Sequence, residues 1–320
     1  AYEIRLSLVG SEMCIRDSPI TVKNECRKHN GFSFPEANTV TYTFPGTRYT
    51  TNKLTWVWTD GQFPLIEDDL KLPNQDEYDS YTSKLRNYRD LPRELKNVLT
   101  AIPKETHPMD VLRTGTSMLG NLEPEGDFAN QNDTADRILA AMPSIMTYWY
   151  RASHFGEDID TLTDHKTMGG QFLSLLTGSE PSDEHTRALD TSLICYAEHG
   201  FNASTFTART CASTLSDMHS CITAAIGTLR GPLHGGANEA AMEMIEKFSS
   251  REDANVGVKN MLANKEKIMG FGHAVYSNED PRNKIVKAWA KKLSSNASNS
   301  VIYDVSEEIE KVMSEEKNLF

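Results

Sequence analysis

The stretch RGPLHGGANEAAM, from Arg230 to Met242, places one histidine between a proline turn and a pair of glycines. Proline disfavours helical geometry in the residue before it, so Pro232 predicts the end of a helix. We expect Asn238 to cap a new helix, because apolar residues recur at helical spacing after it. His234 is therefore predicted to lie at a sharp bend between two helices.

Most of the chain beyond Leu72 carries apolar residues at the spacing of an α-helix. Small residues dominate the run from Ala203 to Leu229, and they let helices approach closely. We expect a buried helix pair or an interface helix there. The predicted fold class is all-α, with helices at Tyr81–Arg86, Leu91–Leu99, Met109–Leu122, Ala135–Tyr150, Gln171–Leu176, Thr186–Glu198, within Ala203–Leu229, Lys284–Leu293 and Val305–Met313.

The first part of the chain follows different patterns. LVGSEMCIRDS, which ends at Ser18, resembles a translated transposase sequencing adapter, so residues 1–18 are predicted to be non-native. Residues 19–72 are rich in threonine and aromatic residues, and their alternation predicts short strands around the turn at Pro45 and Gly46. We leave residues 19–72 unassigned, since a frameshift or a chimeric join would explain their composition.

The bulk composition limits the class of protein. The chain has 320 residues, a formal charge of −12 and 38% hydrophobic residues, which is enough for one large or two modest domains. An acidic balance argues against nucleic acid or an anionic membrane as the main partner. No apolar run is clean enough to span a bilayer. The five cysteines form no CxxC pattern, so we expect a reducing, cytoplasmic setting.

Two histidines lie among glycines, His234 in GPLHGGAN and His273 in IMGFGHAVY. Glycine permits close approach of a ligand and unusual backbone angles. A single histidine in such a turn is more often structural, but here His199 and Arg282 complete a constellation. Arginine can hold a carboxylate by two parallel hydrogen bonds, and histidine can stabilise charge that develops on a carbonyl oxygen. The histidine spacing does not support a metal site, and none is predicted.

Long segments of the chain resemble the citrate synthase family. These segments are HPMDVLRTGTSMLGNLEPE (His107–Glu125), AEHGFNASTFTAR (Ala197–Arg209), GTLRGPLHGGANEAAM (Gly227–Met242) and IMGFGHAVYSNEDPRNK (Ile268–Lys284). The resemblance covers about residues 73–320. It implies an all-α, dimeric enzyme with a large helical domain over 73–234 and a smaller, incomplete helical domain over 235–320.

The resemblance also implies a mechanism and its residues. His199 and Arg282 are expected to bind oxaloacetate. His273 is expected to polarise the keto carbonyl of oxaloacetate. His234 is expected to donate to the thioester oxygen of an acyl-CoA and so to stabilise its enol. No cofactor is implied, because the CoA thioester is a substrate.

Within the family, three segments resemble the 2-methylcitrate synthase branch, which condenses propanoyl-CoA with oxaloacetate: FNASTFTAR at Phe201–Arg209, GHAVY at Gly272–Tyr276 and DPRN at Asp280–Asn283. Citrate synthase, which uses acetyl-CoA, is the alternative. A non-catalytic helical protein that binds the same ligands is an alternative of another class. Lys287, Lys291 and Lys292 can meet the phosphates of CoA, but a solvated helix face is the simpler interpretation.

The family's general base has no match in this chain. In the family it is an aspartate in a PNLDF-like segment, which normally follows a phrase like the EEKNLF that ends at Phe320. We expect that aspartate and further oxaloacetate-binding arginines to lie beyond residue 320, and residues 19–320 alone to be inactive. None of Asp304, Glu307 and Glu308 matches the position of the base.

Overall fold

A computed structural model describes residues 39–43, 53–57, 74–197, 202–272, 280–295, 297 and 299–319. The chain divides into two compact units, residues 1–74 and residues 75–320. The predictions for residues 1–18, and for most of residues 19–72, lie outside the described residues.

Two short strands are described in the first unit. β1 (Thr39–Thr43) pairs with β2 (Lys53–Val57) in antiparallel register, with Thr41 opposite Thr55. The pair flanks the predicted turn at Pro45 and Gly46, so the expectation of short strands in this segment is confirmed where the structure describes it.

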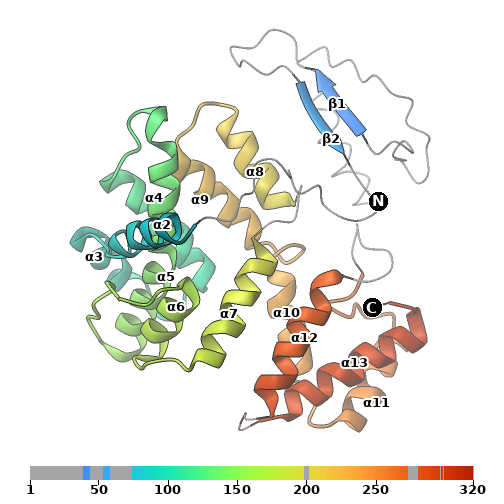
Figure 1. Ribbon diagram of the computed structural model, residues 1–320. Helices are drawn as coiled ribbons and strands as arrows, with labels where there is room; N and C mark the ends of the chain where they lie inside the picture. Colours follow the sequence, from blue (N-terminus) through green and yellow to red (C-terminus); the bar gives the residue numbers. More distant parts are fainter. Residues whose placement is uncertain are drawn as a thin grey trace. The chain divides into compact units, whose positions relative to one another are not determined.

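Every regular element described in the second unit is a helix, in agreement with the predicted fold class (Figure 1). The elements in chain order are α2 (Gln75–Asn87), α3 (Arg93–Ala101), α4 (Pro108–Leu122), the short 3-10 helix η1 (Phe128–Asn130), α5 (Gln131–Phe155), α6 (Met168–Thr177), α7 (Asp183–Tyr196), α8 (Ala203–Ala212), α9 (Met218–Leu229), α10 (Gly236–Ile245), α11 (Arg251–Ala263), α12 (Pro281–Ser294) and α13 (Val301–Lys317).

The start of α10 and the presence of α11 differ from the sequence predictions. α10 begins at Gly236, so Asn238 lies inside its first turn and does not cap it. The sharp turn before α10 already gives Gly235 a helical backbone (φ −60°, ψ −32°), and this starts the helix before Asn238. The pattern also missed α11, although Ser250 accepts from the Asp253 backbone N–H, as a helix cap does.

One hydrophobic core surrounds α5, which contacts α2, α3, α4, α6 and α9. Leu95 and Leu99 of α3, Leu119 of α4 and Ile145 of α5 are all but inaccessible to solvent. Burying a side chain of this kind stabilises the fold by about 1.5–3 kcal/mol. This core therefore holds α4 together with α9, the helix that leads to His234.

A second core joins α10, α11 and α13. Its buried members include Met244 of α10, Val258 of α11 and Ile309 of α13. Met244 is one of the apolar residues whose helical spacing predicts the helix that follows His234. The two cores share no residue, and the predicted domain boundary at His234 stays a prediction.

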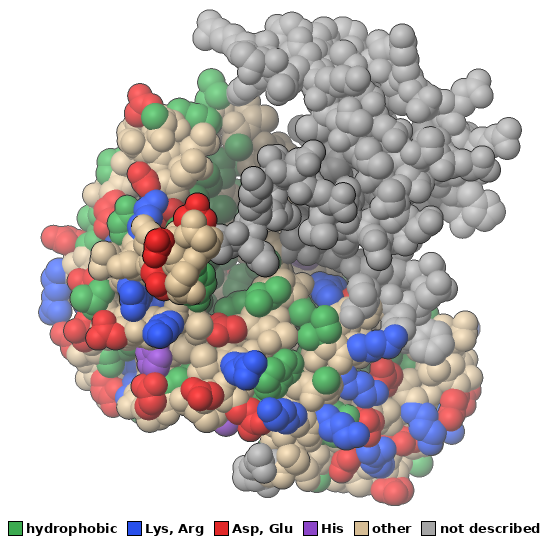
Figure 2. Space-filling view, viewed as in Figure 1, with side chains coloured by type: hydrophobic (Ala, Val, Ile, Leu, Met, Phe, Trp, Pro, Cys, Tyr) green, Lys and Arg blue, Asp and Glu red, His purple; other side chains and the backbone are tan. Residues whose placement is uncertain are grey.

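Acidic and basic side chains are intermixed on the described surface that Figure 2 displays. None of the helices in the described part of the chain is both long enough and apolar enough to cross a membrane.

Candidate active site

His234 lies on a short connection between α9, which ends at Leu229, and α10, which begins at Gly236. A Cβ atom on Gly235 would lie 2.6 Å from the carbonyl oxygen of Leu229. A Cβ atom on Gly236 would lie 3.1 Å from the carbonyl oxygen of Gly231. The first distance is shorter than real Cβ contacts with backbone, so the turn requires glycine at position 235. The second is tight, and a side chain at position 236 would need the backbone to shift by a few tenths of an ångström.

The imidazole of His234 is hydrogen-bonded to Ser204, near the start of α8. The Ser204 backbone N–H donates to Nε2 at 3.3 Å, and the Ser204 hydroxyl oxygen lies 2.9 Å from the same nitrogen. Because a backbone N–H can only donate, Nε2 must offer a lone pair. Burial lowers the pKa of His234 below its ordinary value and so also favours the neutral ring. The proton of that ring is therefore on Nδ1, which is a hydrogen-bond donor.

The N-terminal cap of α8 fixes Ser204. The Asn202 side-chain oxygen accepts from the Thr205 backbone N–H at 2.9 Å and from the Ser204 hydroxyl at 2.7 Å. A hydroxyl has one proton, so it donates either to Asn202 or to His234 at any moment. The backbone N–H of Ser204 donates to His234 in both cases, and the tautomer does not depend on the hydroxyl.

Arg282 lies in the first turn of α12. Asp280 caps this helix by accepting from the Arg282 backbone N–H at 2.9 Å, and its carboxylate pairs with the guanidinium at 2.6 Å. The guanidinium also lies 5.9 Å from the centre of the Tyr196 ring. These contacts hold the planar fork of Arg282 in one orientation. A substrate carboxylate at this fork has to share it with Asp280 or replace Asp280.

Tyr196 connects Arg282 to the helix that follows His234. The Asn238 side-chain amide, in the first turn of α10, donates to the Tyr196 hydroxyl at 3.3 Å. Arg282 lies over the ring of the same tyrosine. The segments that carry His234 and Arg282 are thus brought together through one aromatic side chain, which the sequence analysis did not identify.

The other two predicted site residues, His199 and His273, lie outside the described residues. Two described residues with contacts in the site flank the segment that contains His199 in the sequence. Tyr196 and Ser204 lie on either side of residues 198–201, and they contact Arg282 and His234 respectively.

The glycines before His273 adopt backbone angles that other residues avoid. Gly270 has φ +93° and Gly272 has φ +82°. A Cβ atom on Gly270 would also lie 3.4 Å from that of Ala241 in α10. This part of the glycine prediction is confirmed, because the IMGFG segment needs left-handed angles and approaches α10 closely.

Two of the lysines considered for CoA phosphates are engaged within the protein. Lys287 forms a short ion pair with Glu310 of α13, and Lys292 pairs with Glu184 of α7 at 2.8 Å. Neither is simply a solvated residue, since each joins α12 to a neighbouring helix. The sequence pattern alone had favoured the solvated face.

The acidic residues of α13 have structural roles. Arg251 donates to Asp304 at 2.8 Å and to Glu307 at 2.7 Å. Asn255 donates to Glu308 at 2.7 Å, and this hydrogen bond lowers the pKa of that carboxyl. A carboxylate stabilised in its charged form is a poor proton acceptor, so Glu308 does not suit the work of a general base.

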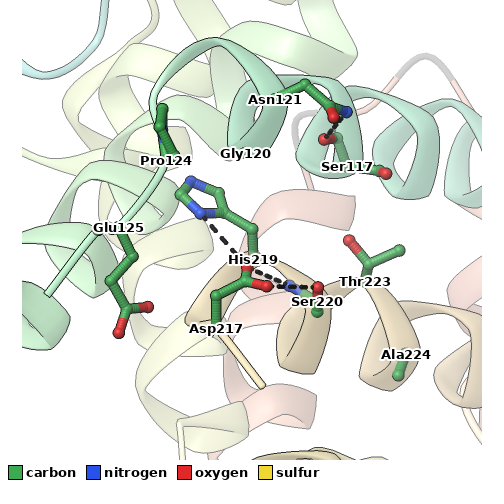
Figure 3. Close-up of a pocket in the computed structure, with 11 residues that line it drawn as sticks. Ser117, Gly120, Asn121, Pro124, Glu125, Asp217, His219, Ser220, Thr223 and Ala224 are labelled. Carbon is green, nitrogen blue, oxygen red and sulfur yellow. Dashed lines mark hydrogen bonds and ion pairs between the residues drawn. The ribbon is translucent and has the colours of Figure 1, made fainter. Parts of the chain in front are cut away.

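A cavity of about 490 Å³ lies between α4 and α9, and none of the predicted site residues lines it (Figure 3). His219 of α9 forms part of its wall and is only 3% exposed. Neither ring nitrogen of His219 has a hydrogen-bond partner among the described residues. Gly120 makes room for this ring, because a Cβ atom there would lie 2.6 Å from that of His219.

Burial lowers the pKa of His219, and it outweighs the Asp217 carboxylate, whose nearest oxygen lies 3.9 Å from Nδ1. The sequence analysis missed this cavity, since a single histidine in a helical run carries no signal of its own. Among the described residues, no group of three or more His, Cys, Asp or Glu side chains could hold a metal ion.

Comparison with known proteins decides the family. Residues 63–320 match the family described as "Citrate synthase, C-terminal domain". A 2-methylcitrate synthase of Shewanella oneidensis is 57% identical over 250 residues, covering 78% of this chain and 67% of that protein. The chain belongs to the citrate synthase family. This confirms the resemblance, and the homologues in the family are condensing transferases.

Other relatives carry the name citrate synthase. The citrate synthase of Deinococcus radiodurans is 40% identical over 248 residues, covering 77% of this chain and 66% of that protein. The solved citrate synthase of Thermoplasma acidophilum, a ternary complex with carboxymethyl coenzyme A and oxaloacetate, superposes with a TM-score of 0.72 at 28% identity. That match covers 78% of this chain and 67% of the solved one. The chain thus spans about two thirds of the length of these citrate synthase family relatives.

We predict that His219 makes the stability of the unit depend on pH. Its pKa is lowered in the folded state, so below about pH 6.5 the unfolded chain gains a proton that the folded chain resists. Stability is therefore present above this pH and falls as the pH drops through it. Urea unfolding at pH 8 and pH 5.5 should show a larger loss for the wild type than for His219→Phe. Equal losses would contradict this account of His219.

Proposed function

We propose that the whole protein condenses an acyl-CoA thioester with oxaloacetate and then hydrolyses the thioester, releasing CoA. The observation that carries the proposal is the neutral ring of His234, whose Nε2 accepts from Ser204 and whose Nδ1 carries a proton. A neutral donor of this kind stabilises the negative charge that develops on a thioester oxygen as its α-proton leaves. It does not add a positive charge to a half-buried site.

The remaining roles follow from the resemblance and the geometry around His234. Arg282 binds a carboxylate of oxaloacetate through its planar fork, in the place that Asp280 now occupies. His199 binds oxaloacetate beside it. His273 donates to the keto oxygen, which becomes an alkoxide when the new carbon–carbon bond forms. Support for His199 and His273 comes from the family motifs that contain them.

Propanoyl-CoA is the proposed acyl donor, with acetyl-CoA as the alternative. The 57% identity to the Shewanella oneidensis 2-methylcitrate synthase supports the first, and the 40% identity to the Deinococcus radiodurans citrate synthase supports the second. The two donors differ by one methylene. An apolar pocket discriminates such a difference by about 1–3 kcal/mol, or roughly 10–200-fold in kcat/KM.

The acyl preference can be measured by following CoA release from the whole protein with saturating oxaloacetate. We expect kcat/KM for propanoyl-CoA to exceed that for acetyl-CoA by about 10-fold or more. The opposite order would identify acetyl-CoA as the substrate. Absence of CoA release with both donors would contradict the proposed activity itself.

Substitution of His234 tests its proposed role. His234→Ala should lower kcat by roughly 100-fold or more, since it removes a donor that acts on developing charge. Ser204→Ala is the matched control. It removes the hydroxyl but keeps the backbone N–H that fixes Nε2, so its kcat should fall much less. A Ser204→Ala enzyme as slow as His234→Ala would show that the hydroxyl, not the backbone, sets the state of the ring.

We further propose that the protein is a homodimer. Large apolar side chains remain exposed on and beside α8 and α9, including Phe206 (52% exposed), Leu215 (65%) and Leu233 (72%). Apolar surface of this kind is typical of an interaction site. Light scattering on the whole protein should give twice the chain mass at micromolar concentration. A monomer across the accessible concentration range would exclude this proposal.

A cytoplasmic location is proposed as well. Cys195, Cys211 and Cys221, the cysteines that the structure describes, are all free thiols, as is usual in a reducing compartment. Cell fractionation tests this location, and recovery of the protein outside the cytoplasm would contradict it.

A further inference from the structure

The first turn of α4 holds both ends of the bend that carries His234. This turn comes from HPMD, residues 107–110, a motif that the proposed chemistry does not use. His107 is the N-terminal cap of α4, and Asp110 lies in the first turn of that helix. Each makes a side-chain contact with the far segment around His234, more than a hundred residues away in sequence.

The ring of His107 contacts both α4 and α10, and these two contacts select one tautomer. Its Nδ1 accepts from the Met109 backbone N–H at 3.1 Å, so this nitrogen carries no proton. Its Nε2 lies 2.9 Å from a carboxylate oxygen of Glu239. The neutral ring with its proton on Nε2 satisfies both contacts at once, because Nε2–H donates to Glu239 while Nδ1 accepts from the helix.

Asp110 reaches the other end of the bend. Its carboxylate accepts from Arg230 at 3.4 Å, where α9 ends, and pairs with Arg113 of its own helix at 3.1 Å. Arg230 precedes His234 by four positions, and Glu239 follows it by five. The bend is therefore tied to one helical turn at two points, one on each side of the histidine.

α4 is a rigid base for these contacts. Val111 and Leu119 of α4 are fully buried in the core that also contains Ile226 of α9. Close packing of this kind resists displacement, so the backbone that carries the side chains at the start of α4 is held in place. A misplacement of about 1 Å at a reacting group can cost roughly 100-fold in rate, which makes such anchoring useful.

We propose that His107 and Asp110, with their partners Glu239 and Arg230, form a clamp that positions His234 for the reaction. This inference rests on the proposed function. Neither His107 nor Asp110 forms a hydrogen bond or ion pair with His234, so they are positioning residues rather than catalytic ones. The clamp acts on the orientation of the bend and leaves the Ser204 contact with Nε2 to set the tautomer.

Substitutions at His107 and Glu239 separate the clamp from the helix cap. His107→Asn keeps a good N-terminal cap for α4 but is too short to reach Glu239. Glu239→Ala removes the acceptor, whereas Glu239→Gln keeps an oxygen that accepts from Nε2–H. We expect His107→Asn and Glu239→Ala each to lower kcat by about 10-fold, part of the cost of a 1 Å misplacement, with KM for oxaloacetate little changed. Glu239→Gln should stay close to the wild type.

Two further measurements complete the test. The melting temperature of each variant should fall by less than about 4 °C, because the contact is partly exposed and weak in itself. The double variant His107→Asn/Glu239→Ala should be no slower than either single variant, since both remove the same interaction. An unchanged kcat in the single variants, additive losses in the double variant, or a Glu239→Gln enzyme as slow as Glu239→Ala would each overturn the clamp.

Failure of the clamp is distinguishable from failure of the proposed function. If the wild type releases no CoA with either acyl donor, the proposed function fails, and nitrogen NMR of the His234 ring then tests the clamp. The clamp predicts one sharp set of His234 signals in the wild type and in Glu239→Gln, and broadened or doubled signals in His107→Asn. Identical signals in all three proteins would overturn it.

Discussion

The hydrogen bond from the Ser204 backbone to Nε2 of His234 is the interaction on which the account of the site depends. It joins the start of α8 to the bend before α10, and it decides which ring nitrogen holds the proton. The donor belongs to the backbone at a capped helix terminus, so it cannot rotate away or change its protonation. The chemistry proposed for His234 follows from this one constraint, because a neutral ring with Nδ1–H can stabilise an enol without adding charge.

The rest of the structure serves to keep that bend in place. The core around α5 holds α4 and α9, and the second core holds α10 against α11 and α13. Gly235 lets the chain turn against its own backbone, since a Cβ atom there would lie 2.6 Å from the carbonyl oxygen of Leu229. Tyr196 then brings Arg282 to the same region through Asn238. Stability and positioning thus use different residues, since the buried apolar side chains fix the helices and the polar ones orient the site.

Much of this could be predicted from the sequence, and the failures have physical causes. Helical periodicity located the long amphipathic helices, and the glycines at 270 and 272 indicated left-handed backbone angles that the structure contains. The start of α10 was predicted too late, because Asn238 has a capping side chain but the turn at Gly235 begins the helix first. Tyr196, His107 and Glu239 were missed as parts of the site, since their contacts join segments that only the fold brings together. His219 was not predicted, because the sequence does not show whether a histidine in a helix is buried or whether its ring nitrogens have hydrogen-bond partners.

The central claim is that folded His234 is neutral, with its proton on Nδ1 and a lone pair on Nε2. Neutron diffraction from deuterated crystals of the whole protein near pH 7 tests this most directly, because it locates the exchanged hydrogens. The account predicts deuterium on Nδ1 of His234, none on Nε2, and a Ser204 N–D vector directed at Nε2. Deuterium on Nε2, or on both nitrogens, would contradict it.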